Sequence, residues 1–307
     1  MNDSVLETIG SPLVRIGGPT GATVAAKLEG FNPGGSAKDR PARAMIEAAE
    51  RDGVLEPGDR IVEPTSGNTG IGIALVGAAN GYDVTLVMPA GKSAERRRLM
   101  RAYGADLELI EGSISDARER AAELADESGV VTLDQFENAA NPGAHEATTA
   151  RELLDQVDRP IDALVVAVGT GGTLSGLTRG LRAGGQNPLI VAVEPDENAL
   201  LSGDDPGDDE FQGMGPGFVS PNLDESAIDR IERVAIGPAE DECRRLASEE
   251  GILVGQSSGA ASLAAKRVAR AFVGGELDTD ADDPLVVTVF PDNGERYLST
   301  GLFDREE

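Results

Sequence analysis

Short apolar runs alternate with helical patterns along this 307-residue chain, and this alternation restricts the fold more than any other feature. Repeated strand–helix alternation predicts parallel sheets with helices on both faces. Two such blocks divide near residue 140, so we expect two α/β domains with a cleft between them. The expected strands are residues 22–28, 60–63, 83–88, 106–110, 130–133, 162–168, 189–193 and 285–290. The expected helices include residues 39–51, 71–80, 93–103, 115–127, 144–156, 239–250 and 258–272.

The charge balance limits the partners of the chain. It contains 54 acidic and 27 basic residues, a net charge of −27, which argues against binding to nucleic acid or to an anionic membrane surface. Excess acid with few aromatic residues is also typical of disorder. Hydrophobic residues make up 40% of the chain and fall in regular blocks, so we expect a folded protein with a heavily hydrated acidic surface, as in halophilic proteins.

Such a surface predicts a dependence on salt, because counter-ions screen the repulsion between carboxylates. We expect both the activity and the melting temperature to fall when the protein is diluted from high salt into low salt. A melting temperature that is the same with and without salt would contradict the halophilic interpretation.

Cysteine and histidine are too scarce for several kinds of site. Cys243 and His145 are the only residues of their types, which excludes an intramolecular disulfide and a metal site built from Cys and His. Residues 1–10 are polar and acidic, so we expect no secretory signal. No apolar run reaches the length of a membrane span. The sequence therefore predicts a soluble, cytoplasmic protein without a metal.

Lys38 ends a glycine-rich turn, residues 32–38, that follows an expected strand and opens an expected helix. An amine can lose its proton and condense with a carbonyl, whereas a guanidinium cannot. A solvated lysine at the start of a helix explains this stretch alone equally well. The chain has only four lysines, which are Lys27, Lys38, Lys92 and Lys266.

Three further turns connect a strand to a helix. Residues 169–173 (Gly-Thr-Gly-Gly-Thr) offer N–H groups and hydroxyls that suit a phosphate, although glycines needed only for packing are the alternative. Leu174 replaces the third glycine of a dinucleotide fingerprint, so that interpretation fails. Residues 65–70 (Thr-Ser-Gly-Asn-Thr-Gly) suit a carboxylate, and residues 255–260 carry two serines that on their own indicate a helix cap.

A single distinctive lysine beside a phosphate site suggests pyridoxal phosphate, a phosphorylated aldehyde held as a Schiff base. Nucleoside triphosphate binding at Gly91-Lys92-Ser93 is rejected, because the first glycine of a P-loop would fall at Leu86. Residues 92–98 are instead expected to form a solvated basic face.

Five ordered motifs resemble the cysteine synthase (O-acetylserine sulfhydrylase) and cystathionine β-synthase family of pyridoxal-phosphate enzymes. They are residues 32–40, 65–70, 169–173, 255–260 and 291–299. The resemblance covers nearly the whole chain and implies the fold-type-II architecture. In that architecture two three-layer αβα domains with mostly parallel sheets have the active site between them. It implies a large cofactor-binding domain of residues 1–34 and 141–307, and a smaller, mobile substrate-carboxylate domain of residues 35–140.

The resemblance also implies roles for individual residues. Lys38 is similar to the catalytic lysine that forms the Schiff base, Asn68 to the residue that binds the ring oxygen, and Ser257 to the partner of the pyridine nitrogen. The implied phosphate site is Gly169, Thr170, Gly171, Gly172 and Thr173. The implied site for the substrate carboxylate is Thr65, Ser66, Thr69 and Gln135.

The implied reaction is a β-replacement that converts O-acetyl-L-serine, or another activated serine, and sulfide to L-cysteine. The loop at residues 213–224 resembles cysteine synthases, whereas residues 148–152 are closer to the branch that joins serine and homocysteine. The leaving group stays open between acetyl, phosphate and hydroxyl. A non-catalytic module that senses a metabolite or docks a partner is a third alternative, against which Lys38 argues. The resemblance further implies a homodimer and allows docking of the C-terminal peptide of serine acetyltransferase.

Overall fold

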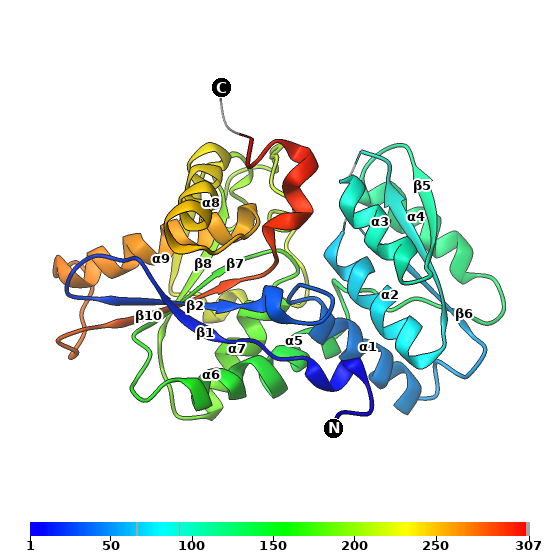
Figure 1. The fold of residues 1–307 in the computed structure, drawn as a ribbon, viewed down its shortest axis with the longest axis horizontal. Helices are drawn as coiled ribbons and strands as arrows, with labels where there is room; N and C mark the ends of the chain where they lie inside the picture. Colours follow the sequence, from blue (N-terminus) through cyan, green and yellow to red (C-terminus); the bar gives the residue numbers. More distant parts are fainter. Residues whose placement is uncertain (66, 92, 305–307) are drawn as a thin grey trace.

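The computed structural model describes residues 1–65, 67–91 and 93–304, in which the strands form two sheets (Figure 1). The six-stranded sheet has the order β1-β2-β10-β7-β8-β9, and the four-stranded sheet has the order β5-β4-β3-β6. All pairings are parallel except that of β1 with β2, so the prediction of mostly parallel sheets is confirmed. The strands are β1 (Leu13–Ile16), β2 (Thr23–Leu28), β3 (Arg60–Pro64), β4 (Asp83–Pro89), β5 (Asp106–Ile110), β6 (Val130–Val131), β7 (Ala163–Ala167), β8 (Leu189–Pro195), β9 (Arg230–Val234) and β10 (Leu285–Phe290).

Helices cover both faces of the six-stranded sheet. Successive side chains of a strand point to opposite faces, and this separates Val165 of β7 from its neighbours Leu164 and Val166. Val165 belongs to the apolar core under α8 (Ile236–Glu250) and α9 (Gln256–Val273). Leu164 and Val166 belong to the core on the opposite face, which α6 (Ala150–Gln156) and α7 (Gly172–Ala183) cover.

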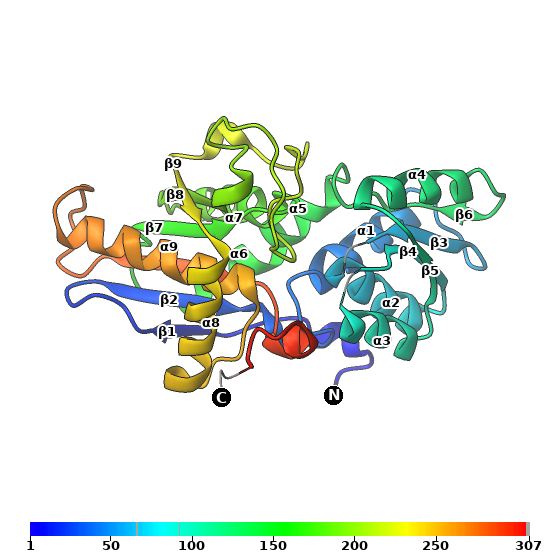
Figure 2. The ribbon, with the colours of Figure 1, turned by 90° about the horizontal axis from the view of Figure 1, so that it is seen from above.

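The four-stranded sheet is built in the same way. Ile61 of β3 packs in a core with α1 (Asp39–Arg51), α2 (Asn68–Asn80) and α3 (Ala94–Ala102). Its neighbour Val62 packs in a core on the other face with α4 (Ile114–Ala125). Figures 1 and 2 show this unit beside the larger one in two perpendicular views. The predicted pair of three-layer αβα units is confirmed.

Two local predictions need correction. The single helix expected over residues 144–156 is divided into α5 (Ala140–Ala144), a π-helical turn at His145–Thr149, and α6. The buried His145 ring lies in that turn, with Nδ1 2.9 Å from Thr149 Oγ1 and Nε2 3.2 Å from Thr173 Oγ1. Strand β9 was not predicted, because its Arg-Ile-Glu-Arg-Val sequence is the charged pattern of an edge strand.

A buried group of charges lies where α1 meets β2 and α6. Arg40 Nε is 2.7 Å from Glu29 Oε2, and Arg40 Nη1 is 2.6 Å from Glu152 Oε1. Lys27 Nζ lies 2.6 Å from the other oxygen of Glu152. Burial would raise the pKa of Glu29, but the charge and hydrogen bonds of Arg40 outweigh it and lower that pKa to about 2. The group links α1, which packs with the smaller sheet, to elements of the larger unit.

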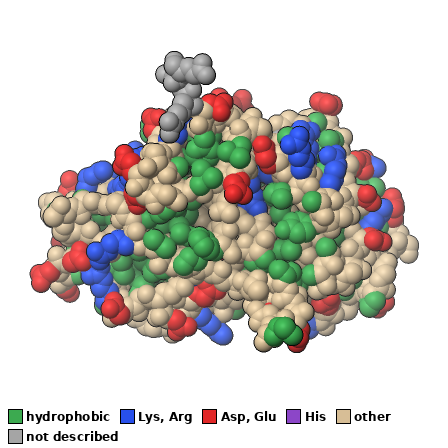
Figure 3. Space-filling model, viewed as in Figure 1, with side chains coloured by type: hydrophobic (Ala, Val, Ile, Leu, Met, Phe, Trp, Pro, Cys, Tyr) green, Lys and Arg blue, Asp and Glu red, His purple; other side chains and the backbone are tan. Residues whose placement is uncertain are grey.

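Charged side chains of both signs are interspersed over the face in Figure 3. Exposed pairs such as Arg43–Glu47 and Arg60–Glu127 each contribute less than about 1 kcal/mol. The predicted dependence on salt stays a prediction. None of the described helices is long and apolar enough to cross a membrane.

Candidate active site

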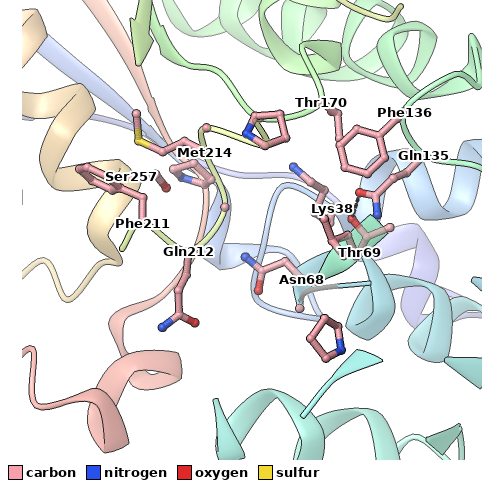
Figure 4. Close-up of a pocket in the computed structure, with 18 of the residues that line it drawn as sticks. Lys38, Asn68, Thr69, Gln135, Phe136, Thr170, Phe211, Gln212, Met214 and Ser257 are labelled. Carbon is pink, nitrogen blue, oxygen red and sulfur yellow. Dashed lines mark hydrogen bonds between the residues drawn. The ribbon is translucent and has the colours of Figure 1, made fainter. Parts of the chain in front are cut away.

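A cavity of about 320 Å³ lies between the two units and is lined by residues of both. Seven of the predicted site residues line it, and Figure 4 shows Lys38 pointing into the space between Ser257 on one side and Gln135 on the other. The seven are Lys38, Asn68, Thr69, Gln135, Gly169, Thr170 and Ser257. Thr65, Gly171, Gly172 and Thr173 are not among the lining residues, and Ser66 lies outside the described residues.

The turn that carries Lys38 is held by its own neighbours. Asn32 Nδ2 donates to the backbone oxygens of Glu29 and Ser36, and the N–H of Ala37 donates to Pro291 O at 2.8 Å. Burial lowers the pKa of Lys38, although the charges of Asp292 and Glu29 oppose the shift. A larger fraction of the Lys38 amine is therefore neutral near pH 7 than for an exposed lysine, and the neutral amine is the nucleophile and the base.

Three helices point their N-termini at this cavity without a side-chain cap. Their N-cap residues are Gly67 in α2, Gly171 in α7 and Gly255 in α9, and none of them accepts a capping hydrogen bond. The helix dipole and the N–H groups of the first turn that stay unpaired favour negative charge at such positions, although Thr65 Oγ1 already accepts the N–H of Gly70 in α2. The arrangement fits a cofactor that carries a phosphate, together with a substrate that carries a carboxylate.

Gly171 is required by the shape of the turn at the start of α7. Its φ is +77°, and an added Cβ would lie 2.5 Å from Leu223 Cβ and 2.7 Å from Leu223 Cα. We expect Gly171→Ala to displace the turn and to weaken pyridoxal phosphate binding at least about tenfold, as measured by titrating the cofactor-free protein. Gly185→Ala is the matched control, because Gly185 has φ +83° but nothing within 4 Å of its added Cβ. Equal affinities for the two variants would contradict a role for this turn.

The predicted carboxylate site is assembled from two segments. Thr69 Oγ1 donates to Gln135 Oε1 at 2.5 Å, as the dashed line in Figure 4 shows. Thr65 is fully buried, and its Oγ1 accepts the N–H groups of Gly67 and Gly70 at 3.1 and 3.0 Å. Thr65 therefore shapes the loop from behind, whereas Thr69 and Gln135 face the cavity.

Glu63 fixes the turn that carries Gln135, a role that is not apparent from the sequence. Its buried carboxylate accepts the backbone N–H groups of Leu133, Asp134 and Gln135 at 3.1, 3.0 and 3.1 Å. Burial raises the pKa of Glu63 to about 7, although these three hydrogen bonds favour the ionised form. The available signal was a glutamate at the end of an apolar strand.

Glu63 predicts a pH dependence of stability. A carboxyl with a higher pKa in the folded protein than in the unfolded chain binds more protons when folded, so its contribution to stability decreases as the pH rises. The free energy of unfolding of the wild type, relative to Glu63→Gln, should fall by up to about 3 kcal/mol between pH 4.5 and pH 8. Urea unfolding at several pH values measures this difference, and a difference that does not vary with pH would contradict the prediction.

Arg96 corrects the expectation of a solvated basic face at residues 92–98, of which Lys92 lies outside the described residues. Its side chain lines the cavity and is only 2% exposed, and its Nη2 donates to Tyr297 Oη at 2.9 Å. The loop at residues 209–216 also lines the cavity, including Phe211, Gln212 and Met214. No group of His, Cys, Asp or Glu suited to a metal ion occurs among the described residues.

Comparison with protein families identifies the chain. Residues 6–292 match the model of the pyridoxal-phosphate dependent enzyme family. The chain belongs to this family. As a pyridoxal-phosphate dependent enzyme it uses the cofactor that the Lys38 turn and the phosphate turn predicted, so that prediction is confirmed.

Individual members of the family are similar over their whole length. The cysteine synthase of Staphylococcus aureus (strain N315) is 48% identical over 99% of this chain and 98% of its own. The structure of O-ureido-L-serine synthase superposes with a TM-score of 0.93 at 42% identity, covering 100% of this chain and 96% of that one. The cysteine synthase of Entamoeba histolytica has a TM-score of 0.93 at 36% identity, covering 100% and 92%. These similarities also confirm the fold-type-II architecture.

Proposed function

We propose that this protein is a cysteine synthase, which converts O-acetyl-L-serine, or another activated serine, and sulfide to L-cysteine. One observation carries the proposal. Lys38, Asn68, Gln135 and Ser257 come from four separate segments to one cavity, in a chain 48% identical over its length to a cysteine synthase. The alternative reaction, between serine and homocysteine, gains no specific support from the geometry of the cavity.

Bound pyridoxal phosphate withdraws electrons from the α-carbon of an amino-acid substrate and so allows the β-substituent to leave. Lys38 would hold the cofactor at rest, because its partly neutral amine can condense with an aldehyde. Once the amino group of the substrate has displaced it, Lys38 Nζ would accept the α-proton as a general base. The lowered pKa of Lys38 suits both tasks.

The remaining residues would orient the two molecules. Thr69, Gln135 and the N–H groups at the start of α2 would bind the substrate carboxylate and present the α-carbon to Lys38. Gly169 to Thr173 would bind the phosphate at the start of α7. Ser257 would face the pyridine nitrogen with a hydroxyl, which, unlike a carboxylate, does not hold that nitrogen protonated. A weaker electron sink of this kind favours elimination over transamination.

Several further features belong to this proposal. The boundaries at residues 34/35 and 140/141, and closure of residues 35–140 over the substrate, are part of it. A homodimer, a cytoplasmic location and docking of the C-terminal peptide of serine acetyltransferase are also proposed and await direct measurement.

The test is a visible absorbance spectrum of the protein loaded with pyridoxal phosphate. We expect a band that changes on addition of O-acetyl-L-serine and returns on addition of sulfide, with L-cysteine as the product. A band that responds to O-phosphoserine or to serine, but not to O-acetyl-L-serine, would redirect the choice of substrate. A band restored only by homocysteine would favour cystathionine synthesis, and a protein that binds no cofactor would overturn the proposal.

A further inference from the structure

Asp292 contacts the site at Asn68. It lies two residues after the end of β10, and its side chain is 1% exposed. Its Oδ2 accepts a hydrogen bond from Asn68 Nδ2 at 2.7 Å and another from Tyr297 Oη at 3.0 Å. A buried carboxylate beside a site residue needs an explanation, because burying a charge is costly unless hydrogen bonds compensate for it.

The contact fixes which way the Asn68 carboxamide points. A carboxylate only accepts hydrogen bonds, so it attracts the NH₂ end of an amide and repels the oxygen. Asn68 Oδ1 has no partner among the described residues, so no bond of its own holds the amide in place. Nδ2 carries two hydrogens, and with one directed at Asp292 the other remains for the cavity. Asp292 therefore makes Asn68 a hydrogen-bond donor toward a ligand.

Tyr297 and Arg96 also contact Asp292. Tyr297 is fully buried, and burial together with the charge of Asp292 raises its pKa, so its phenol stays protonated and donates. Arg96 Nη2 donates to the same phenol oxygen and lies 3.7 Å from Asp292 Oδ2. The Arg96 guanidinium also lies 5.1 Å from the centre of the Tyr297 ring. The chain of contacts joins α3 of the smaller unit to the C-terminal segment.

The backbone of Asp292 places it between two other parts of the site. It forms a β-bridge with Ser36, two residues before Lys38, and its carbonyl accepts the N–H of Gly255, two residues before Ser257. A Cβ on Gly255 would lie 2.4 Å from Asp292 Oδ1, so that position has no room for a side chain. The carboxylate is thereby held in one place relative to the cavity.

We propose that Asp292 is a positioning residue that acts through Asn68, presenting an N–H of the Asn68 carboxamide to the ring oxygen of the cofactor. The inference rests on the proposed role of Asn68 and adds the residue that determines its orientation. Asp292→Asn keeps the size of the side chain but offers a donor as well as an acceptor. It therefore lets either end of the Asn68 amide face the cavity.

A double-mutant cycle tests the proposal on cofactor affinity. We expect Asp292→Asn to weaken pyridoxal phosphate binding about tenfold in the wild-type background and to have little further effect in the Asn68→Ala background. The visible band of the bound cofactor should also shift more in Asp292→Asn when Asn68 is present than in the Asn68→Ala background, where only the effect of the Asp292 charge on Lys38 remains. Equal losses of affinity in both backgrounds, or none in the wild-type background, would overturn the proposal.

A milder variant covers the case in which Asp292→Asn fails to fold. Tyr297→Phe keeps the ring but removes the hydroxyl that donates to Asp292. We expect a smaller loss of cofactor affinity, which should again occur only when Asn68 is present. Tyr82→Phe is the matched control, because it removes only an exposed hydrogen bond to Glu50 and should leave affinity unchanged. If Tyr297→Phe behaves like this control, the proposal fails. A wild-type protein that binds no cofactor would overturn the proposed function as well.

Discussion

Lys38→Ala should abolish turnover while the protein remains folded. The variant lacks the amine that we propose to hold the cofactor and to take the α-proton, so we expect the rate of cysteine formation to fall at least about 1,000-fold. The fold should survive, because the hydrogen bonds of Lys38 to other described residues involve its backbone rather than its amine. Assays with O-acetyl-L-serine and sulfide measure the rate, and the melting temperature of the cofactor-free protein measures the fold.

Lys38→Arg is the matched control for charge. A guanidinium keeps the positive charge and much of the length of the side chain, but it neither condenses with an aldehyde nor gives up its proton. We expect it to be as inactive as Lys38→Ala. Turnover near the wild-type rate in either variant would refute the proposed mechanism. Inactivity of the alanine variant alone would show that only the charge at this position matters.

Glu29→Ala should cause a large loss of stability, although Glu29 does not line the cavity. Glu29 and Arg40 are both buried, and the change leaves Arg40 Nε without its partner. Removing one member of a buried ion pair costs about 3–5 kcal/mol when the other charge is left unpaired. Because Arg40 keeps its pairing with Glu152, we expect a loss near the lower end of this range. Urea unfolding of the cofactor-free protein gives the difference in the free energy of unfolding.

Glu47→Ala provides the comparison. Glu47 pairs with Arg43 on the same helix as Arg40, at 2.6 Å, but both side chains are substantially exposed. Its loss should cost less than about 1 kcal/mol. Similar losses of stability in the two variants would show that burial does not increase the contribution of the Glu29–Arg40 pair to stability.

Local chemistry made the main parts of the site predictable from the sequence. Lys38 and the turn at residues 169–173 each lie at the start of a helix, and a few adjacent residues carry the whole signal. Sheet order followed less directly, but the alternation of elements restricted it to parallel sheets covered by helices.

The supporting residues could not be predicted, because their partners are remote in the sequence. Arg96 lies in a basic stretch of α3, and only Tyr297, 201 positions away, explains its burial. Asp292 and Asn68 are separated by 224 positions, and Glu63 and Gln135 by 72. A single sequence contains no local pattern for such pairs, which exist only once the sheets have formed.

The pairing of β2 with β10 has a consequence for synthesis on the ribosome. Thr23 of β2 pairs with Leu285 of β10. The larger sheet therefore cannot be completed until β10, which is synthesised near the end of translation, is available to pair with β2. The four-stranded sheet needs only the segment from Arg60 to Val131 and can form while the rest is still being translated. Closure over so long a loop is intrinsically slow, which leaves the apolar edge of β2 exposed in the nascent chain. We therefore expect chaperones to bind the nascent chain mainly at the first and last strands of the larger sheet.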